Sequence, residues 1–227
     1  MLGFLPSWVD PVARYMLETG LKLTGEISAV AVGGSAVVGI VLGTFLTIRF
    51  WPLRWAIRLY VEVWRGLPII VTIFLIYFSL PILGIRLNAW LSAAVGLALW
   101  GSAQVAEATR GAIQSIPREQ HEAASALGFG WVGRHVFVIL PQGLRRLLPP
   151  LVSLLVNVIQ NSTLALLIGA GEVLATAQRE TETLQAPAPI GVGNAHAVAL
   201  YGAVAVVFFL ISFPLTRLAA FLERRLV

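Results

Sequence analysis

The sequence predicts an all-α membrane protein with five transmembrane helices in a single domain over residues 1–227. Hydrophobic residues make up 58% of the chain and charged residues only 12%, and the mean hydropathy is +0.84, values far from those of a soluble domain. Five stretches contain no Asp, Glu, Lys or Arg, and each is about 20 residues or longer, the length that a helix needs to cross the hydrocarbon. They are Ile27–Ile48, Gly66–Ile85, Leu87–Ala106, Leu147–Gly171 and Ala197–Thr216. A soluble helical domain of this size could not bury five such helices on all sides.

Basic residues predict the orientation of these spans, because Lys and Arg are retained on the cytoplasmic side of a membrane. With the N-terminus outside, twelve of the sixteen basic residues fall in inner segments or at inner helix ends. We therefore expect an outer N-terminus and a cytoplasmic C-terminus. The arginines are divided among loops and helix ends rather than gathered on one soluble face, which argues against nucleic-acid binding.

The first twenty residues lack the basic start and apolar run of a cleaved signal. Asp10, Arg14 and Glu18 recur every four residues among apolar side chains, which indicates a short amphipathic helix over 1–20 on the outer membrane surface. The chain has no cysteine, so disulfides, thiolate metal sites and cysteine nucleophiles are excluded.

Small residues mark one face of the first span. Ser35, Gly39 and Gly43 are spaced by four, which is typical of close helix packing in a membrane and is also compatible with a surface that moves. Pro68 and Pro81 lie near the ends of the second span, where a missing amide hydrogen starts or bends a helix.

The inner segment 107–146 joins the third and fourth spans and is too polar to cross a membrane. Pro117 at a helix start and Gly128 after a helix end predict a short helix over Pro117–Leu127, with Arg118 and Glu122 as an i, i+4 pair. Such a helix could insert into a groove on a partner protein, or could simply join the two spans.

Several motifs carry a resemblance to a known family. Glu122-Ala123-Ala124, then Gly128, then Ile139-Leu140-Pro141 resemble the "EAA, G, I-L-P" signature of ABC importer permeases. Further pieces are similar to the polar amino acid group of that family: Tyr60 to Pro68, Phe74 to Pro81, with Ser79 where glycine is usual, Ala106 to Pro117, and Leu222 to Arg225. The resemblance covers almost the whole chain.

The resemblance implies a type I ABC importer permease fold in a bacterial inner membrane. It implies that the subunit works in a pair with an identical or similar permease, on an ATPase dimer, and receives a polar amino acid from an extracytoplasmic binding protein. The inserted coupling helix would carry Arg118, Glu122, Ala123, Ala124 and Gly128. Lys22 is the only lysine, so a phosphate-binding GxxxxGK[ST] loop is impossible; the chain needs no cofactor itself, and ATP and Mg would belong to the partner ATPase.

Polar groups inside a span are costly and mark a pathway or an interior contact. Glu107 lies at i, i+3 from Arg110 at the inner end of the third span, an arrangement that favours a structural pair. Gln160, Asn161, Ser162 and Thr163 follow one another within the fourth span, where substrate contact and helix-to-helix hydrogen bonding remain equal alternatives. The family usually has lysine where this chain has Gln160.

The outer loop 172–196 contains Pro187-Ala188-Pro189 and Gly191-Val192-Gly193 and either reaches the binding protein or is a plain connector. His121, His135 and His196 have no visible acid–base partner in a span, which favours solvated or interfacial roles over metal ligation. A passive channel or a non-transporting assembly subunit remains the alternative function, and neither the amino acid carried nor the identity of the second permease follows from the sequence.

Overall fold

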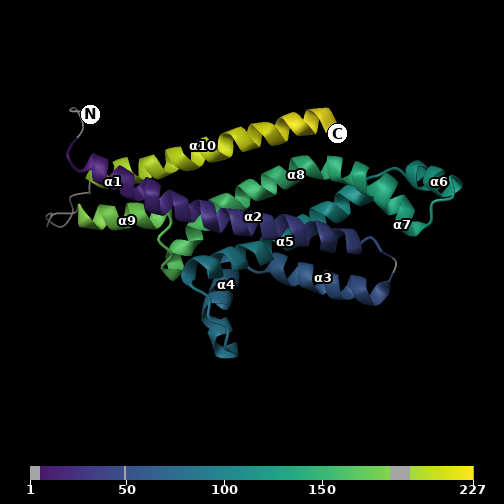
Figure 1. The fold of residues 1–227 in the computed structure, drawn as a ribbon, viewed down its shortest axis with the longest axis horizontal. Coiled ribbons are helices and arrows are strands. Elements are labelled where there is room, and N and C mark those ends of the chain that lie inside the picture. Colours follow the sequence, from purple (N-terminus) through teal and green to yellow (C-terminus); the bar gives the residue numbers. More distant parts are fainter. Residues whose placement is uncertain (1–5, 49, 185–194, 227) are drawn as a thin grey trace.

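The computed structural model describes residues 6–48, 50–184 and 195–226. Within those residues the chain is helical and contains no strand. Four long helices form the body of the molecule: α2 (Lys22–Phe45), α5 (Ala89–Gln114), α8 (Leu140–Asn161) and α10 (Ala195–Leu226) (Figure 1). Helices α1 (Val9–Tyr15) and α9 (Val173–Thr183) lie at one end of this elongated bundle, and α6 (Arg118–Ala126) and α7 (Trp131–Arg134) lie at the other.

The described residues contain four helical runs that are long and apolar enough to cross a membrane: Val9–Phe45, Ala89–Gln114, Trp131–Ile168 and His196–Leu226. A fifth crossing exists if a bent pair, Trp51–Gly66 with Ile69–Leu83, counts as one span. This count agrees with the five predicted spans, and the predicted all-α membrane fold is confirmed. Helices α1 and α6 lie at opposite ends (Figure 1), as the three crossings between them require.

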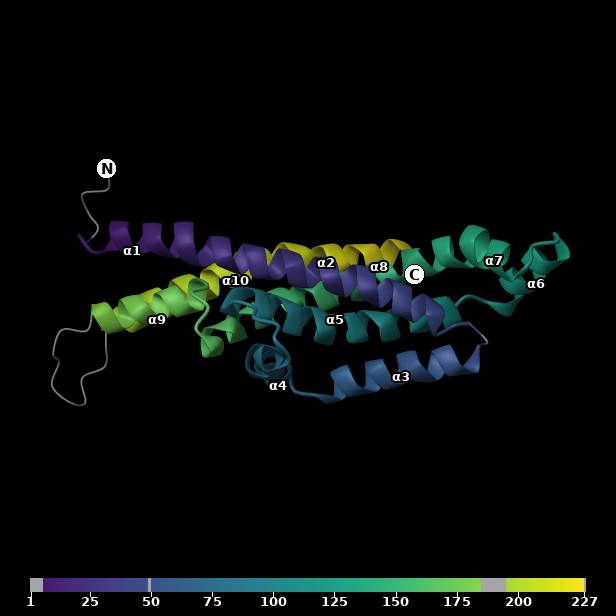
Figure 2. The ribbon, with the colours of Figure 1, turned by 60° about the horizontal axis from the view of Figure 1, so that its bottom comes forward.

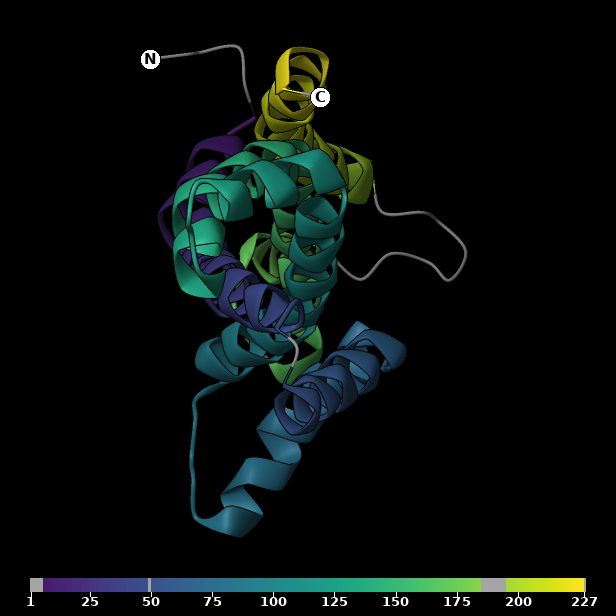
Figure 3. The same cartoon turned by 90° about the vertical axis from the view of Figure 1, so that its right-hand side faces the viewer.

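The second predicted span, Gly66–Ile85, is not a straight helix. Helix α3 (Trp51–Gly66) ends where Leu67 is extended, with φ −83° and ψ 139°, and α4 (Ile69–Phe74) then leaves at 108° to it. The bend follows from Pro68, because a proline pushes the residue before it out of the helical region and has no amide to donate. Figures 2 and 3 show α3 beside the bundle near α5. Helix α4 packs against α5, where Ile73 is fully buried, and the turns that follow α4 point away from the bundle (Figure 1).

The N-terminal segment differs from the separate surface helix that we expected over 1–20. Helix α1, a π-helical stretch and α2 instead form one continuous helix from Val9 to Phe45. The four-residue charge spacing is present, but it continues through Lys22 to Glu26 on the same helix, where Lys22 and Glu26 approach to 4.0 Å. Residues 1–5 lie outside the described part.

Helix α2 packs along α5 through the small residues found in the sequence. A β-carbon at Gly39 would lie 2.7 Å from the Ser102 carbonyl oxygen, and one at Gly43 would lie 2.4 Å from the Ala106 carbonyl oxygen. Ser35 is fully buried in the same row. The packing interpretation of this row therefore holds, because no side chain fits between the two backbones.

The segment 107–146 is more helical than a connecting loop. Helix α5 continues to Gln114, α6 and α7 follow, and a π-helical stretch from His135 to Ile139 leads directly into α8. The non-helical inner connection is therefore confined to short turns around α6. Arg49, one of the predicted inner basic residues, lies outside the described residues.

The outer segment 172–196 contains α9, which begins at a buried carboxylate. Glu172 has no exposed surface and accepts hydrogen bonds from the backbone amides of Leu174 (2.9 Å) and Ala175 (2.8 Å). The Val173 amide donates to Thr24 Oγ1 of α2 at 3.1 Å, which fixes the start of α9 against the first helix. Burial raises the pKa of Glu172 to about 7. The proline and glycine runs at 187–193 lie outside the described residues.

Candidate functional site

Helix α6 has sharply defined ends. Pro117 precedes it with φ −57° and ψ 147°, and Gly128 follows it with φ 81°, a left-handed conformation that glycine adopts without a steric penalty. The Phe129 amide donates to the Ala124 carbonyl (3.1 Å) and the Gly128 amide to the Ser125 carbonyl (3.0 Å). These are the two hydrogen bonds of a Schellman cap, so the predicted helix and its glycine stop are present in the structure.

Most of α6 is exposed. Arg118, Glu122, Ala123 and Gly128 face outward, and only Ala124 is buried, at 2% exposure. The predicted Arg118–Glu122 pair does not form, since neither side chain joins an ion pair within the described residues. Both charges are therefore open to a partner.

Polar contacts hold α6 to α7 and α8. Arg134 Nη1 donates to Ser125 Oγ at 2.8 Å, and Gln142 Nε2 donates to Gln120 Oε1 at 3.2 Å. We expected a solvated or interfacial role for His135; its side chain is buried, and its ring stacks on Trp131 with centroids 4.0 Å apart. One side of α6 is therefore held by α7 and α8, and the other side, its outer face, is exposed.

Exposed apolar side chains lie in the segment that follows α6. Leu127 is 78% exposed, Phe137 70% and Val132 64%. Exposed apolar side chains grouped beside an exposed helix are typical of a protein-binding surface.

Glu107 and Arg110 form the structural pair that their spacing favours. Arg110 Nε donates to Glu107 Oε2 at 2.9 Å, and a second hydrogen bond joins Arg110 Nη2 to Glu107 Oε1. Arg58 of α3 lies 3.6 Å from the same carboxylate. Glu107 therefore holds α3 to α5, and it is not among the residues that line the polar groove described below.

The four polar residues of the fourth span lie where α8 changes into a 3₁₀ helix (Ser162–Ile168). Ser162 is fully buried and its hydroxyl donates to the Ile159 carbonyl (2.7 Å), while Thr163 donates to the Gln160 carbonyl (2.9 Å). Gln160 Nε2 donates to Ser212 Oγ of α10 at 3.2 Å, and Asn161 Nδ2 donates to the Asn157 carbonyl at 2.7 Å. Gln160 thus makes the helix-to-helix contact, and the structure brings none of the four into the groove lining.

A groove of about 750 Å³ runs between α3, α5, α8 and α10. Its polar lining residues are Arg65, Gln104, Ser153, Asn157, Thr216 and Glu223. The sequence patterns did not predict these residues as a site, although Gln104 and Asn157 are isolated polar residues inside charge-free spans. Ser153, Asn157 and Asn161 are also spaced by four, so they share one face of the helix. This spacing would have indicated that the polar stripe extends from Asn161 toward the groove.

Hydrogen bonds orient the groups in this groove. Arg65 Nε donates to Gln104 Oε1 at 3.2 Å, which leaves the Gln104 amide nitrogen as a donor. Asn157 Nδ2 donates to the Ser153 carbonyl at 3.1 Å, and since a carbonyl only accepts, the Asn157 Oδ1 atom is left as an acceptor. The groove therefore combines donors from α3 and α5 with acceptors from α8 and α10.

Three features occur together: apolar helices form a bundle, a polar groove runs along it, and an exposed helix is held in place at one end. This combination defines the class as the membrane-spanning subunit of a transport complex. Comparison with known proteins gives the family. The chain belongs to the family described as "Binding-protein-dependent transport system inner membrane component", whose sequence model matches residues 36–227.

Curated relatives cover most of the chain. It is 34% identical to the "Glutamine transport system permease protein GlnP" of Escherichia coli (strain K12) over 97% of this chain and 96% of that one. It is 37% identical to the "Probable amino-acid ABC transporter permease protein YckA" of Bacillus subtilis (strain 168) over 68% of this chain and 69% of that one. The predicted resemblance to amino-acid ABC transporter permeases is confirmed.

Solved structures share the fold. A chain of the "Crystal structure of an amino acid ABC transporter with histidines" superposes with a TM-score of 0.81 at 24% identity, covering 98% of this chain and 100% of that chain. A chain of an inward-facing MetNI methionine ABC transporter gives a TM-score of 0.73 at 20% identity, covering 96% and 99%. The type I importer permease fold is confirmed.

Proposed function

We propose that this chain carries an amino acid across the inner membrane as one half of a permease pair, driven by an ATPase dimer that grips α6. The exposed face of α6 is the observation that carries the proposal. Helix α6 is held by α7 and α8, and its Arg118 and Glu122 side chains make no ion pair within the described residues. A partner that binds these side chains can therefore displace α6, and the displacement is transmitted to α5 and α8.

The arrangement of the ends supports the proposed orientation. Helix α6 and the C-terminal end of α10 lie toward one end of the bundle, and α1 and α9 lie at the other (Figure 1). The ATPase end is cytoplasmic in our proposal, so the N-terminus faces the outside, as the distribution of basic residues predicts. The α1–α9 end would then meet the amino-acid-binding protein. ATP and Mg would be held by the ATPase partner.

The polar groove supports an amino acid as the solute. A free amino acid has a carboxylate and an ammonium group, which need donors and acceptors respectively. Arg65 and the Gln104 amide nitrogen can donate to the carboxylate, and Asn157 Oδ1 and the Glu223 carboxylate can accept from the ammonium group. Asn161, Ser162 and Thr163 would then support the α8 backbone behind the groove, and Gln160 would hold α10 in place.

Reconstitution tests the proposal. The full chain is purified with co-expressed partner subunits and placed in vesicles, and ATP-dependent amino-acid uptake is measured. Flux without ATP would instead indicate a passive channel, and an assembled complex without any flux would indicate an assembly subunit.

Two variants of α6 test the coupling assignment. Glu122→Gln removes an open charge, and Gly128→Ala forces a side chain into a left-handed conformation at a cost of about 1–2 kcal/mol. We expect both to reduce ATPase co-purification and uptake. Glu182→Gln, exposed on α9 at the opposite end of the bundle, is the charge control for ATPase co-purification. Gly130→Ala is the glycine control for both measurements, because Gly130 has φ −64° and open space around it. Full ATPase binding and uptake by both α6 variants would reject the assignment.

A further inference from the structure

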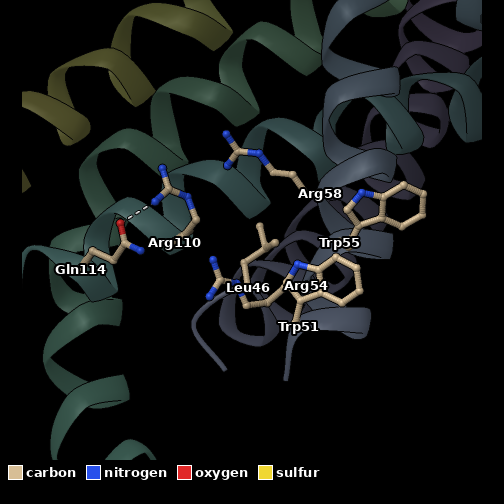
Figure 4. Close-up of a pocket in the computed structure, with 7 residues that line it drawn as sticks. All are labelled: Leu46, Trp51, Arg54, Trp55, Arg58, Arg110 and Gln114. Atoms are coloured by element: carbon tan, nitrogen blue, oxygen red, sulfur yellow. Dashed lines mark hydrogen bonds between the residues drawn. The ribbon is translucent and has the colours of Figure 1, made fainter. Parts of the chain in front are cut away.

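A cleft lined by arginines lies at the α6 end of the bundle, outside the polar groove. It consists of two adjoining hollows of about 360 Å³ and 460 Å³ that share Leu46, Arg54 and Gln114. The first hollow is lined by Arg54, Arg58, Arg110, Trp51 and Trp55, among others. Figure 4 shows the three guanidinium groups on one side of this hollow and the two indole rings on the other.

The second hollow is also basic. Arg54, Arg118, Arg134, His121 and His135 line it, and no carboxylate does. Arg134 Nε is buried and has no hydrogen-bond partner within the described residues. Burial, and after it the charge of Arg134, lower the pKa of His121.

Nearby carboxylates neutralise only part of this charge. Glu62 lies 3.0 Å from Arg58, and Glu107 pairs with Arg110 and Arg58. Arg54 and Arg118 have no ion pair in the part of the chain that the structure describes. The cleft therefore has a surplus of positive charge that lacks a partner inside this chain.

The cleft lies at the level where the membrane surface is expected. Leu46 follows the last residue of α2, and Gln114 is the last residue of α5, so two spans end at its wall. Trp51 is 71% exposed and Trp55 59%. Exposed tryptophans at the ends of spans are typical of the headgroup region, since the indole ring is apolar and its N–H is polar.

We propose that this cleft binds the phosphate-bearing headgroup of an anionic phospholipid. Guanidinium groups from two elements, Arg54 and Arg58 of α3 and Arg110 of α5, line the same hollow and can donate several hydrogen bonds to a phosphate. Leu46, Trp51 and Trp55 give an apolar edge beside which the glycerol and the first acyl carbons can lie. A free phosphate would satisfy the arginines but would leave this edge uncovered. The site follows from the membrane fold and does not depend on the solute that is carried.

Lipid retention tests the site. The full chain with its co-expressed partners is placed in nanodiscs of phosphatidylcholine containing a minor fraction of phosphatidylglycerol, and the retained lipids are counted by native mass spectrometry. We expect phosphatidylglycerol to be enriched. Arg54→Gln should weaken this enrichment about fivefold, the effect expected for loss of one basic residue near a membrane surface. Arg54→Lys should largely restore it.

Arg145→Gln is the matched control, because Arg145 is exposed on α8 toward the same end of the bundle but lies outside both hollows. Equal loss in Arg145→Gln and Arg54→Gln, or no enrichment in the wild type, would overturn the proposal.

Fluorescence quenching tests the site without a variant. Brominated phosphatidylglycerol should quench the tryptophan fluorescence of the unmodified chain more than brominated phosphatidylcholine does. Equal quenching by the two lipids would argue against the site.

Inorganic phosphate distinguishes the two sources of the anion. It should not displace phosphatidylglycerol at millimolar concentration, because it lacks the apolar part of the lipid. Displacement together with tight binding of phosphate alone in pure phosphatidylcholine would show a soluble-anion site and reject the lipid.

Discussion

Gly43 of α2 faces the backbone of α5 with no space for a side chain. A β-carbon there would lie 2.4 Å from the Ala106 carbonyl oxygen and 2.5 Å from Thr109 Cβ, whereas ordinary contact begins at 3.4 Å. Gly43→Ala therefore requires the two helices to separate locally by about 1 Å, since a backbone oxygen cannot rotate away. Overpacking of this kind costs about 1–3 kcal/mol, and the better helix propensity of alanine returns about 1 kcal/mol. We expect a net loss of up to about 2 kcal/mol.

Gly33→Ala is the matched control on the same helix. A β-carbon at Gly33 meets nothing within 4 Å, so this variant gains the helix propensity without overpacking. Denaturant titration of the detergent-solubilised chain, followed by tryptophan fluorescence, gives the free energy of unfolding of each variant. A Gly43→Ala chain as stable as Gly33→Ala would refute the close approach of α2 and α5.

Further predictions concern the groove, the outer helix and the α3 contact. Asn157→Leu should lower ATP-dependent amino-acid uptake about tenfold by removing an acceptor for a charged group, whereas Asn161→Leu, outside the groove lining, should lower it less; equal effects would contradict the groove assignment. The pKa of Glu172 is about 7 in the folded chain, above the ordinary 4.5, so the folded state binds more protons between these values and the free energy of unfolding should fall by about 3 kcal/mol as pH rises through this window. Glu172→Gln should flatten that dependence in thermal unfolding at several pH values, and an unchanged slope would assign it to another group. Tyr60→Phe removes a 2.7 Å hydrogen bond to Ser102 and should cost about 1 kcal/mol in denaturant titration; no change would mean that Ser102, which also bonds the Leu99 carbonyl, needs no second partner.

The number of crossings and the α6 helix could be predicted because each depends on local chemistry. A span needs only a long apolar run, and a helix stop needs only a glycine such as Gly128. The bend at Pro68 was predictable as a bend, but its angle of 108° was not, because the direction of α4 depends on its packing against α5. The continuity of α1 with α2 was missed because charge between apolar residues suggests a surface helix equally well.

The groove could not be predicted in the same way. Gln160–Thr163 stands out in the sequence as four adjacent polar residues, but each of these side chains bonds to a nearby helix atom, and three bond within their own helix. Gln104, Asn157 and Arg65 are far apart in the sequence, and only the fold brings α3, α5 and α8 together around one groove. A single polar residue in a span is a weak signal unless its tertiary neighbours are known.

The continuous Val9–Phe45 helix also determines how far the molecule projects from the bilayer. Its 37 residues extend about 55 Å at 1.5 Å per residue, against a hydrocarbon thickness of about 30 Å. About 25 Å of the helix therefore extends beyond the hydrocarbon, and α9 is fixed to its side through Thr24. Helix length alone sets the height above the hydrocarbon at which a soluble protein could contact the outer end of this helix. Deleting one turn would lower that height by about 5 Å.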